Sequence, residues 1–89
     1  MKRAWCSFFA VAAATATSLA AASPVTFQQL PAPVQATVTR EIQGGTIHEI
    51  ELDNKRGVVT YEVEFYLAKV KYELEVAADG TLLGRKLDD

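Results

Sequence analysis

Cysteine and histidine are scarce in this sequence, which holds one residue of each type. The cysteine, Cys6, lies in an N-terminal segment that we expect to be removed, so the remaining chain has neither disulfides nor thiol chemistry. That remaining part keeps a single serine, Ser23, at its start. A serine or cysteine nucleophile with a histidine base cannot be assembled from such a set. The sequence therefore predicts no catalytic residues and no enzymatic activity.

Phosphate-binding loops and basic surfaces are lacking as well. Gly44-Gly45 follows an expected helix, whereas a loop that cradles phosphate precedes a helix N-terminus. The formal net charge is −2, and two of the cations, Lys2 and Arg3, belong to the N-terminal segment. A nucleic-acid-binding protein shows a basic patch instead. We therefore expect no bound cofactor and no nucleic-acid partner.

Residues 1–22 are typical of a signal peptide. Lys2 and Arg3 form a basic start, and an apolar stretch from Ala4 to Leu19 is followed by small residues of the kind that a signal peptidase reads. The alternative is a membrane anchor, but the stretch is short for the ~20 residues that span a bilayer and is diluted by serine and threonine. We expect cleavage after Ala22, export to the periplasm or the medium, and no stable membrane span afterwards.

Residues 58–76 alternate apolar and polar side chains almost without a break, which predicts half-buried β-strands. With a turn centred on Ala68-Lys69, Val63 would lie opposite Leu74 on a dry face, and glutamates and lysines would share the wet face. An isolated hairpin is not stable in water. The rest of the chain is therefore expected to cover the dry face.

A helix is predicted before this hairpin. Leu30, Val34, Val38 and Ile42 recur every four residues and form one apolar stripe. Gly44-Gly45 would end the helix, because glycine accepts the left-handed conformation of a C-terminal cap. We expect the stripe to pack against the dry face of the hairpin.

A strand at residues 46–53 is predicted between the helix and the hairpin, with an ambiguous phase. Strict alternation places His48 on the apolar face with Ile50 and leaves Ile47 on the wet face. A bulge near His48 would bring Ile47 inward instead.

A last strand is predicted at residues 81–87, after the turn signal Asp79-Gly80. Leu83 would face the core from this strand. Taken together, the pattern predicts an α+β fold in which one main helix packs on a four-stranded antiparallel β-meander. There are no internal repeats or linkers, so residues 23–89 are expected to form a single domain.

Five motifs follow one another along residues 27–87: LPAPV, GG, an I-x-x-I strand, GVVTYEVEF and YELEVAADGTLL. Their order and spacing resemble the PepSY-like family of small exported domains, which is related to the propeptides of secreted metallopeptidases and, in architecture, to the β-lactamase inhibitory proteins. One departure is the central turn, where Ala68-Lys69 replaces the Asn-Gly or Asp-Gly pair that members often have. The positions that carry the resemblance are Leu30, Pro31, Val34, Gly45, Ile47, Gly57, Tyr61, Glu62, Val63, Tyr72, Glu73, Asp79 and Gly80.

Binding, and not catalysis, is what the resemblance implies. It favours a module that binds or inhibits a peptidase or another envelope protein. The alternative is a structural or envelope-stress protein with no peptidase partner.

The wet face of the hairpin is rich in carboxylates. Glu62 would oppose Glu75, Glu64 would oppose Glu73, and the strand at residues 46–53 would set Glu49 against Glu62. Like charges in these positions cost stability, although a solvated sheet face is the default explanation. By analogy with the sheet surface and adjoining loops that β-lactamase inhibitory proteins use, the candidate partner-binding residues are Glu49, Glu62, Glu64, Tyr66, Leu67, Val70, Glu73 and Glu75.

A metal site is not predicted. His48 neighbours Glu49 and Glu51, but alternation places Glu49 on the opposite face from His48. One histidine without cysteine is also a poor set of transition-metal ligands.

Overall fold

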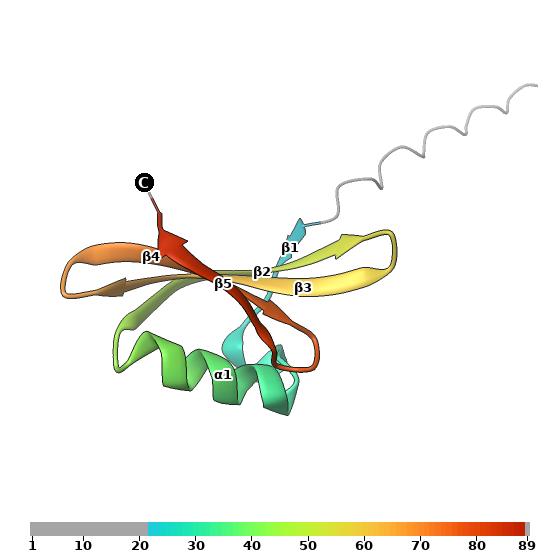
Figure 1. Cartoon of the computed structure of the whole chain (residues 1–89), viewed down its shortest axis with the longest axis horizontal. Coiled ribbons are helices and arrows are strands. Elements are labelled where there is room, and N and C mark those ends of the chain that lie inside the picture. The colour runs from blue at the N-terminus through green and yellow to red at the C-terminus, as the bar shows by residue number, and fades with distance from the viewer. Residues whose placement is uncertain (1–21, 89) are drawn as a thin grey trace, which may run out of the picture.

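The structure, a computed structural model, describes residues 22–88 and has one α-helix packed on a five-stranded antiparallel sheet (Figure 1). The predicted α+β fold is confirmed, but the predicted count of four strands is wrong by one. Except for Ala22, the predicted signal peptide lies outside the described residues. The strands are neighbours in chain order. The elements are β1 (Ala22–Pro24), the 3-10 helix η3 (Phe27–Gln29), α1 (Ala32–Ile42), β2 (Thr46–Lys55), β3 (Val58–Leu67), β4 (Val70–Ala77) and β5 (Leu82–Leu87).

The additional strand, β1, runs antiparallel to β2 along one edge of the sheet, with Ser23 opposite Leu52. The pairing continues beyond it, because the Val25 N–H donates to the Ile50 carbonyl oxygen at 3.0 Å. β1 has three exposed residues, one of them proline. Neither alternation nor β-propensity marks such a segment. Its strand character therefore depends on the partner strand, which is why the sequence does not predict it.

The β3–β4 hairpin has the predicted register, with Val63 opposite Leu74. Ala68 and Lys69 form its two-residue turn, with φ of 54° and 68°. This left-handed conformation is the one that a type I′ turn requires and that glycine or asparagine adopts more easily. A shift of one residue would move every apolar side chain to the other face, so the register is kept despite the unfavourable turn residues.

β2 contains a bulge at His48. The ladder pairs Ile47 and then Glu49 with consecutive residues of β3, so that His48 has no partner of its own. Ile47 packs against the core and His48 is exposed. The bulge alternative is therefore confirmed, and the strictly alternating one is wrong. The predicted pairing of Glu49 with Glu62 is wrong as well, because the extra residue shifts the register so that Glu49 opposes Glu64.

β5 contains a second irregularity. The ladder pairs Glu75 with Gly84 and Val76 with Leu82, which leaves Leu83 between them unpaired. Leu82 packs against the core, whereas Leu83 is 51% exposed. The prediction that Leu83 faces the core is therefore wrong, because the extra residue moves the inward position by one.

The core lies between α1 and the inward face of the sheet. As the sequence predicts, Val34 and Val38 of α1 join Val63 and Leu74 in one buried cluster, each with an exposure of 0%. Full burial of one such side chain contributes about 1.5–3 kcal/mol to stability. The buried cluster consists of Leu30, Val34, Val38, Ile50, Tyr61, Val63, Phe65, Leu74 and Val76.

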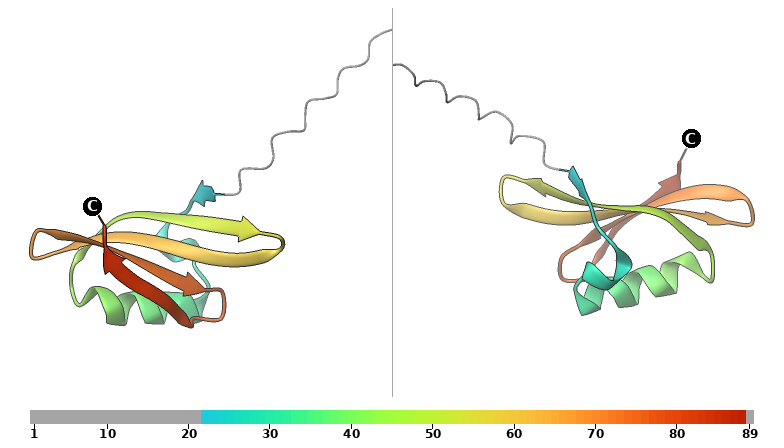
Figure 2. Two further views of the ribbon diagram at one scale, coloured as in Figure 1. Left: turned by 45° about the horizontal axis from the view of Figure 1, so that its top comes forward. Right: turned by 180° about the vertical axis from the view of Figure 1, so that it is seen from behind.

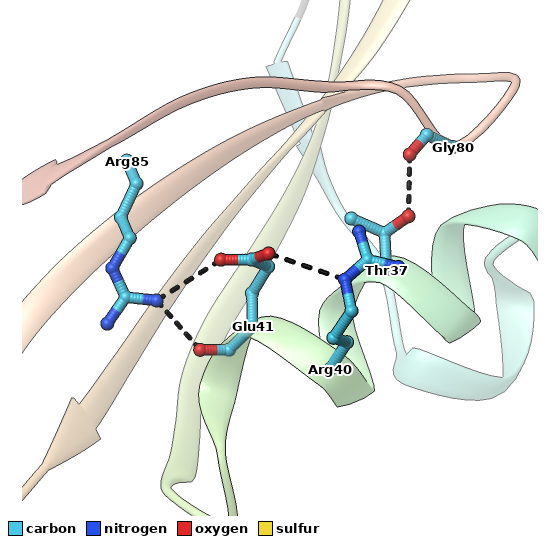
Figure 3. Close-up of polar contacts among 5 residues, drawn as sticks. All are labelled: Thr37, Arg40, Glu41, Gly80 and Arg85. Atoms are coloured by element: carbon cyan, nitrogen blue, oxygen red, sulfur yellow. Dashed lines mark hydrogen bonds and ion pairs between the residues drawn. The ribbon is translucent and has the colours of Figure 1, made fainter.

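Polar contacts join α1 to the β4–β5 hairpin (Figure 3). The buried Thr37 hydroxyl donates to the Gly80 carbonyl oxygen at 2.5 Å. Arg85 Nη1 donates to the Glu41 carbonyl oxygen at 2.8 Å, and the Arg85 guanidinium lies over the Tyr72 ring at 5.0 Å from its centroid. The last carbonyls of a helix lack intrahelical partners, so Arg85 satisfies one of them.

Candidate functional site

The face of the sheet opposite α1 is open. In the views of Figures 1 and 2, α1 lies on one side of the sheet and no element of residues 22–88 covers the other. Six glutamates form two rows across β2, β3 and β4 on this face, and we call them the acidic face. The first row is Glu49–Glu64–Glu73 and the second is Glu51–Glu62–Glu75.

Lysines neutralise only part of the acidic face. Lys71 Nζ lies 3.2 Å from a carboxylate oxygen of Glu64, and Lys86 Nζ lies 3.8 Å from one of Glu73. Both contacts belong to the first row. Within residues 22–88, no lysine or arginine forms an ion pair with the second row. The second row therefore carries uncompensated negative charge.

The carboxyl pKa values of two glutamates on this face are raised, by burial, a shared hydrogen bond and repulsion between like charges. Partial burial, and then repulsion from Glu73, Asp53 and Glu75, raise the pKa of Glu62 above its ordinary value. The pKa of Glu51 is raised as well, chiefly because its carboxyl group shares a hydrogen bond with Glu49. The folded protein thus holds protons on this face more readily than an unfolded chain does. An approaching cation would relieve the same repulsion.

A shallow hollow of ≈ 280 Å³ opens at the β5 side of the acidic face. Gly84 stands opposite Glu75 and has no side chain to fill the space beside it. The volume is at the lower limit of small-molecule pockets, so it suits a single side chain of a partner better than a cofactor. The hollow is lined by Glu62, Glu73, Glu75, Gly84, Arg85 and Lys86.

The β3–β4 turn supplies apolar surface, though less than the sequence suggests. Tyr66 and Val70 are each 40% exposed. Leu67, the third candidate residue at this turn, is half-buried and packs against the core, so it offers less apolar surface than the other two. Tyr66 also meets His48 edge-on, with ring centroids 5.7 Å apart and an angle of 82° between the ring planes.

The bulge in β2 gathers a second group of polar side chains. His48, Glu49 and Glu64 each offer one ligand atom, and these atoms all lie within 4.8 Å of one another. The prediction that Glu49 lies on the opposite face from His48 is wrong, because a bulged strand does not alternate at the extra residue.

The structure brings together the five predicted glutamates and adds Glu51 to them. Alternation from Ile50 and Leu52 already marks Glu51 as outward, so this residue was detectable in the sequence. Its pairing with Glu62 was not predicted, because the bulge at His48 sets the register between β2 and β3.

A scan of the chain against protein-family models finds no match, and a search of the curated proteins finds none either. The resemblance to PepSY-like domains stays a prediction that rests on the motifs given above. Among residues 22–88, no helix has the length and apolar character that crossing a membrane requires.

Proposed function

We propose that the protein is an exported, non-catalytic binding module, similar to PepSY-like domains, whose acidic face meets a basic surface of a protein partner. The observation that carries the proposal is the second row, Glu51–Glu62–Glu75, which three neighbouring strands present without a compensating cation among the described residues. The resemblance favours a peptidase or another envelope protein as the partner.

Electrostatics would govern recognition on this face. Opposed carboxylates destabilise the free protein, and a cationic partner converts their repulsion into attraction. Such charges mainly determine partner choice and association rate, with a marked dependence on salt. Tyr66, at the margin of the face, would supply an aromatic anchor, and the hollow beside Gly84 would receive a lysine or arginine of the partner.

The alternative is a structural or envelope-stress protein that binds no peptidase. Two observations favour it. Lys71 and Lys86 already neutralise part of the first row. Charged side chains on an open sheet face are also the usual state of a soluble protein.

The decisive experiment expresses the full chain, recovers the exported protein and confirms by mass spectrometry the expected N-terminus at Ser23. Cross-linking in the exported fraction then captures partners at low and high salt. We expect the Tyr66→Ala variant and the double variant Glu62→Gln/Glu75→Gln to lose capture at least about tenfold, because the first removes the aromatic anchor and the second removes two of the three charges of the second row. The control Thr39→Ala, on the exposed side of α1, should capture as the parent does.

A captured peptidase whose activity falls when the purified protein is added would support the module, and inhibition should weaken in the same variants. Equal capture by the parent, by Tyr66→Ala and by the double glutamate variant at low salt would reject the acidic face as the binding surface. Absence of any salt-sensitive partner would favour the structural alternative.

A further inference from the structure

The bulge in β2 has a chemical consequence at its outer side. In a regular strand, two consecutive residues point to opposite faces. The extra residue at His48 breaks this rule, so His48 and Glu49 both reach the same outer region beside Glu64 of β3. Bulges often re-aim a side chain in this way near functional sites. We propose that His48, Glu49 and Glu64 form a binding site for a divalent transition-metal ion of the Zn²⁺ type.

The donor set is chemically suited to such an ion. It offers one imidazole nitrogen and two carboxylate oxygens, and sites with three protein ligands leave a fourth position for water or for a group of a partner. Around tetrahedral Zn²⁺, with bonds of 2.0–2.2 Å, ligand atoms lie roughly 3.3–3.6 Å apart. The three atoms here lie within 4.8 Å of one another, so small side-chain rotations close the site.

The surroundings help to hold the site. The edge-on contact with Tyr66 restricts the imidazole of His48, and a restricted ligand loses less freedom when it binds. Glu51, two residues after Glu49 on the same face of β2, adds a carboxylate near the site. Lys71 acts against the ion, because its ammonium already pairs with one oxygen of Glu64. A carboxylate has two oxygens, so Glu64 would bind the metal through the other one.

A nitrogen ligand favours Zn²⁺ over the hard cations. Calcium takes six to eight oxygen ligands, and magnesium prefers oxygen in an octahedral arrangement. Imidazole suits zinc, copper and nickel. The site therefore differs from a general attraction of cations to the acidic face, in which His48 would have no part.

The test titrates the exported protein, expressed from the full chain without a polyhistidine tag, with ZnCl₂ in a calorimeter. We expect one saturable site per chain. His48→Ala should weaken Zn²⁺ binding by about tenfold or more, and Glu49→Gln and Glu64→Gln should also weaken it, since each removes a ligand. The control Asp53→Asn removes one carboxylate from the same strand. It should change binding less than about twofold at 0.15 M salt, where more distant charges are screened. Circular dichroism verifies that every variant is folded.

A second readout uses the fact that the chain has a single histidine, whose imidazole signals in a proton NMR spectrum need no further assignment. Zn²⁺ should shift or broaden these signals in step with the calorimetric titration, whereas MgCl₂ should leave them in place. Unmoved signals with Zn²⁺, or equal binding by His48→Ala and the parent, would overturn the site. Both measurements use the protein alone, so their outcome is independent of the proposed partner.

Discussion

The two faces of the sheet are made by the same strands and differ in what stabilises them. On the inward face, Val63 and Leu74 are fully buried against α1. On the outward face, one residue further along, Glu64 and Glu75 belong to rows of like charge. Apolar burial provides most of the stability of a small domain, whereas opposed carboxylates reduce it. The inward face therefore specifies the fold, and the outward face carries a cost that folding alone does not require.

This difference bears on function. Natural proteins keep destabilising features where function needs them, and this is the part that the proposed binding site would assign to the outward face. Neighbouring residues on one strand offer matched tests, because alternation places them on opposite faces. Each pair below changes one residue per face.

The largest effect is expected for Leu74→Ala, compared with Glu75→Ala next to it. Leu74 is fully buried in the core and Glu75 is exposed. Loss of the leucine side chain leaves a cavity and should lower the free energy of unfolding by ~2–5 kcal/mol. The glutamate change should stay within about 0.5 kcal/mol or stabilise slightly, because it removes a repulsion. Urea denaturation measures both. Similar losses for the two variants would contradict the assignment of the faces.

An intermediate effect is expected for Arg85→Met, compared with Lys86→Met. Arg85 donates to the Glu41 carbonyl oxygen at 2.8 Å and lies over the rings of Phe65 and Tyr72. Its replacement should cost about 1–2 kcal/mol, since a charge-assisted hydrogen bond and cation–π contacts are lost. Lys86 has a side chain that is 73% exposed and pairs with Glu73 at 3.8 Å, so its loss should cost less than about 0.5 kcal/mol. If the two variants lose equal free energy of unfolding in thermal and urea denaturation, the contacts of Arg85 do not stabilise the packing of α1.

The smallest effect is expected for Glu62→Gln, in the dependence of the free energy of unfolding on pH. The pKa of Glu62 lies above the ordinary value of 4.5, chiefly because of burial and then of repulsion by Glu73, Asp53 and Glu75. Between the two pKa values the folded protein binds more protons than the unfolded chain, so stability decreases as pH rises through the raised pKa. Unfolding free energy should therefore be higher near about pH 5 than near about pH 8, and Glu62→Gln should flatten part of this slope.

Glu51 has a raised pKa too, so some slope should remain in that variant. The pKa of Asp79 is lowered below 3.8 by its hydrogen bond with the Thr81 backbone, and its contribution is lost only in more acidic solution. Denaturation of the parent and of Glu62→Gln at several pH values between about 5 and 8 compares the two slopes of stability against pH. If the slope in Glu62→Gln equals that of the parent, Glu62 does not cause the loss of stability at higher pH.

Local periodicity predicted most of the fold. The alternation in β3 and β4 gave their pairing and faces, and the four-residue repeat of α1 gave its buried stripe, because each signal lies within one element. The bulge at His48 was only one of two alternatives, and the irregularity at Leu83 and the strand β1 were not predicted. They depend on how neighbouring strands meet, which no single segment encodes.

The candidate site shows the same division. The outward orientation of its glutamates follows from alternation, whereas their arrangement in two rows needs the bulge in β2. The approach of His48 to Glu64 also depends on that bulge. The predicted resemblance to PepSY-like domains implies binding and supplies no catalytic residues, so it offered no position for a metal.

The irregularity of β5 has a further consequence, for association between copies of the protein. β5 is an edge strand, and a straight edge with free backbone groups is a template on which identical chains add and polymerise. Leu83 and Leu87, 51% and 59% exposed, would add apolar contact to such stacking. The unpaired Leu83 bends and twists the strand, and Arg85 and Lys86 place positive charge along it. We therefore expect the edge to resist strand-by-strand aggregation, so that this small domain stays dispersed at high concentration.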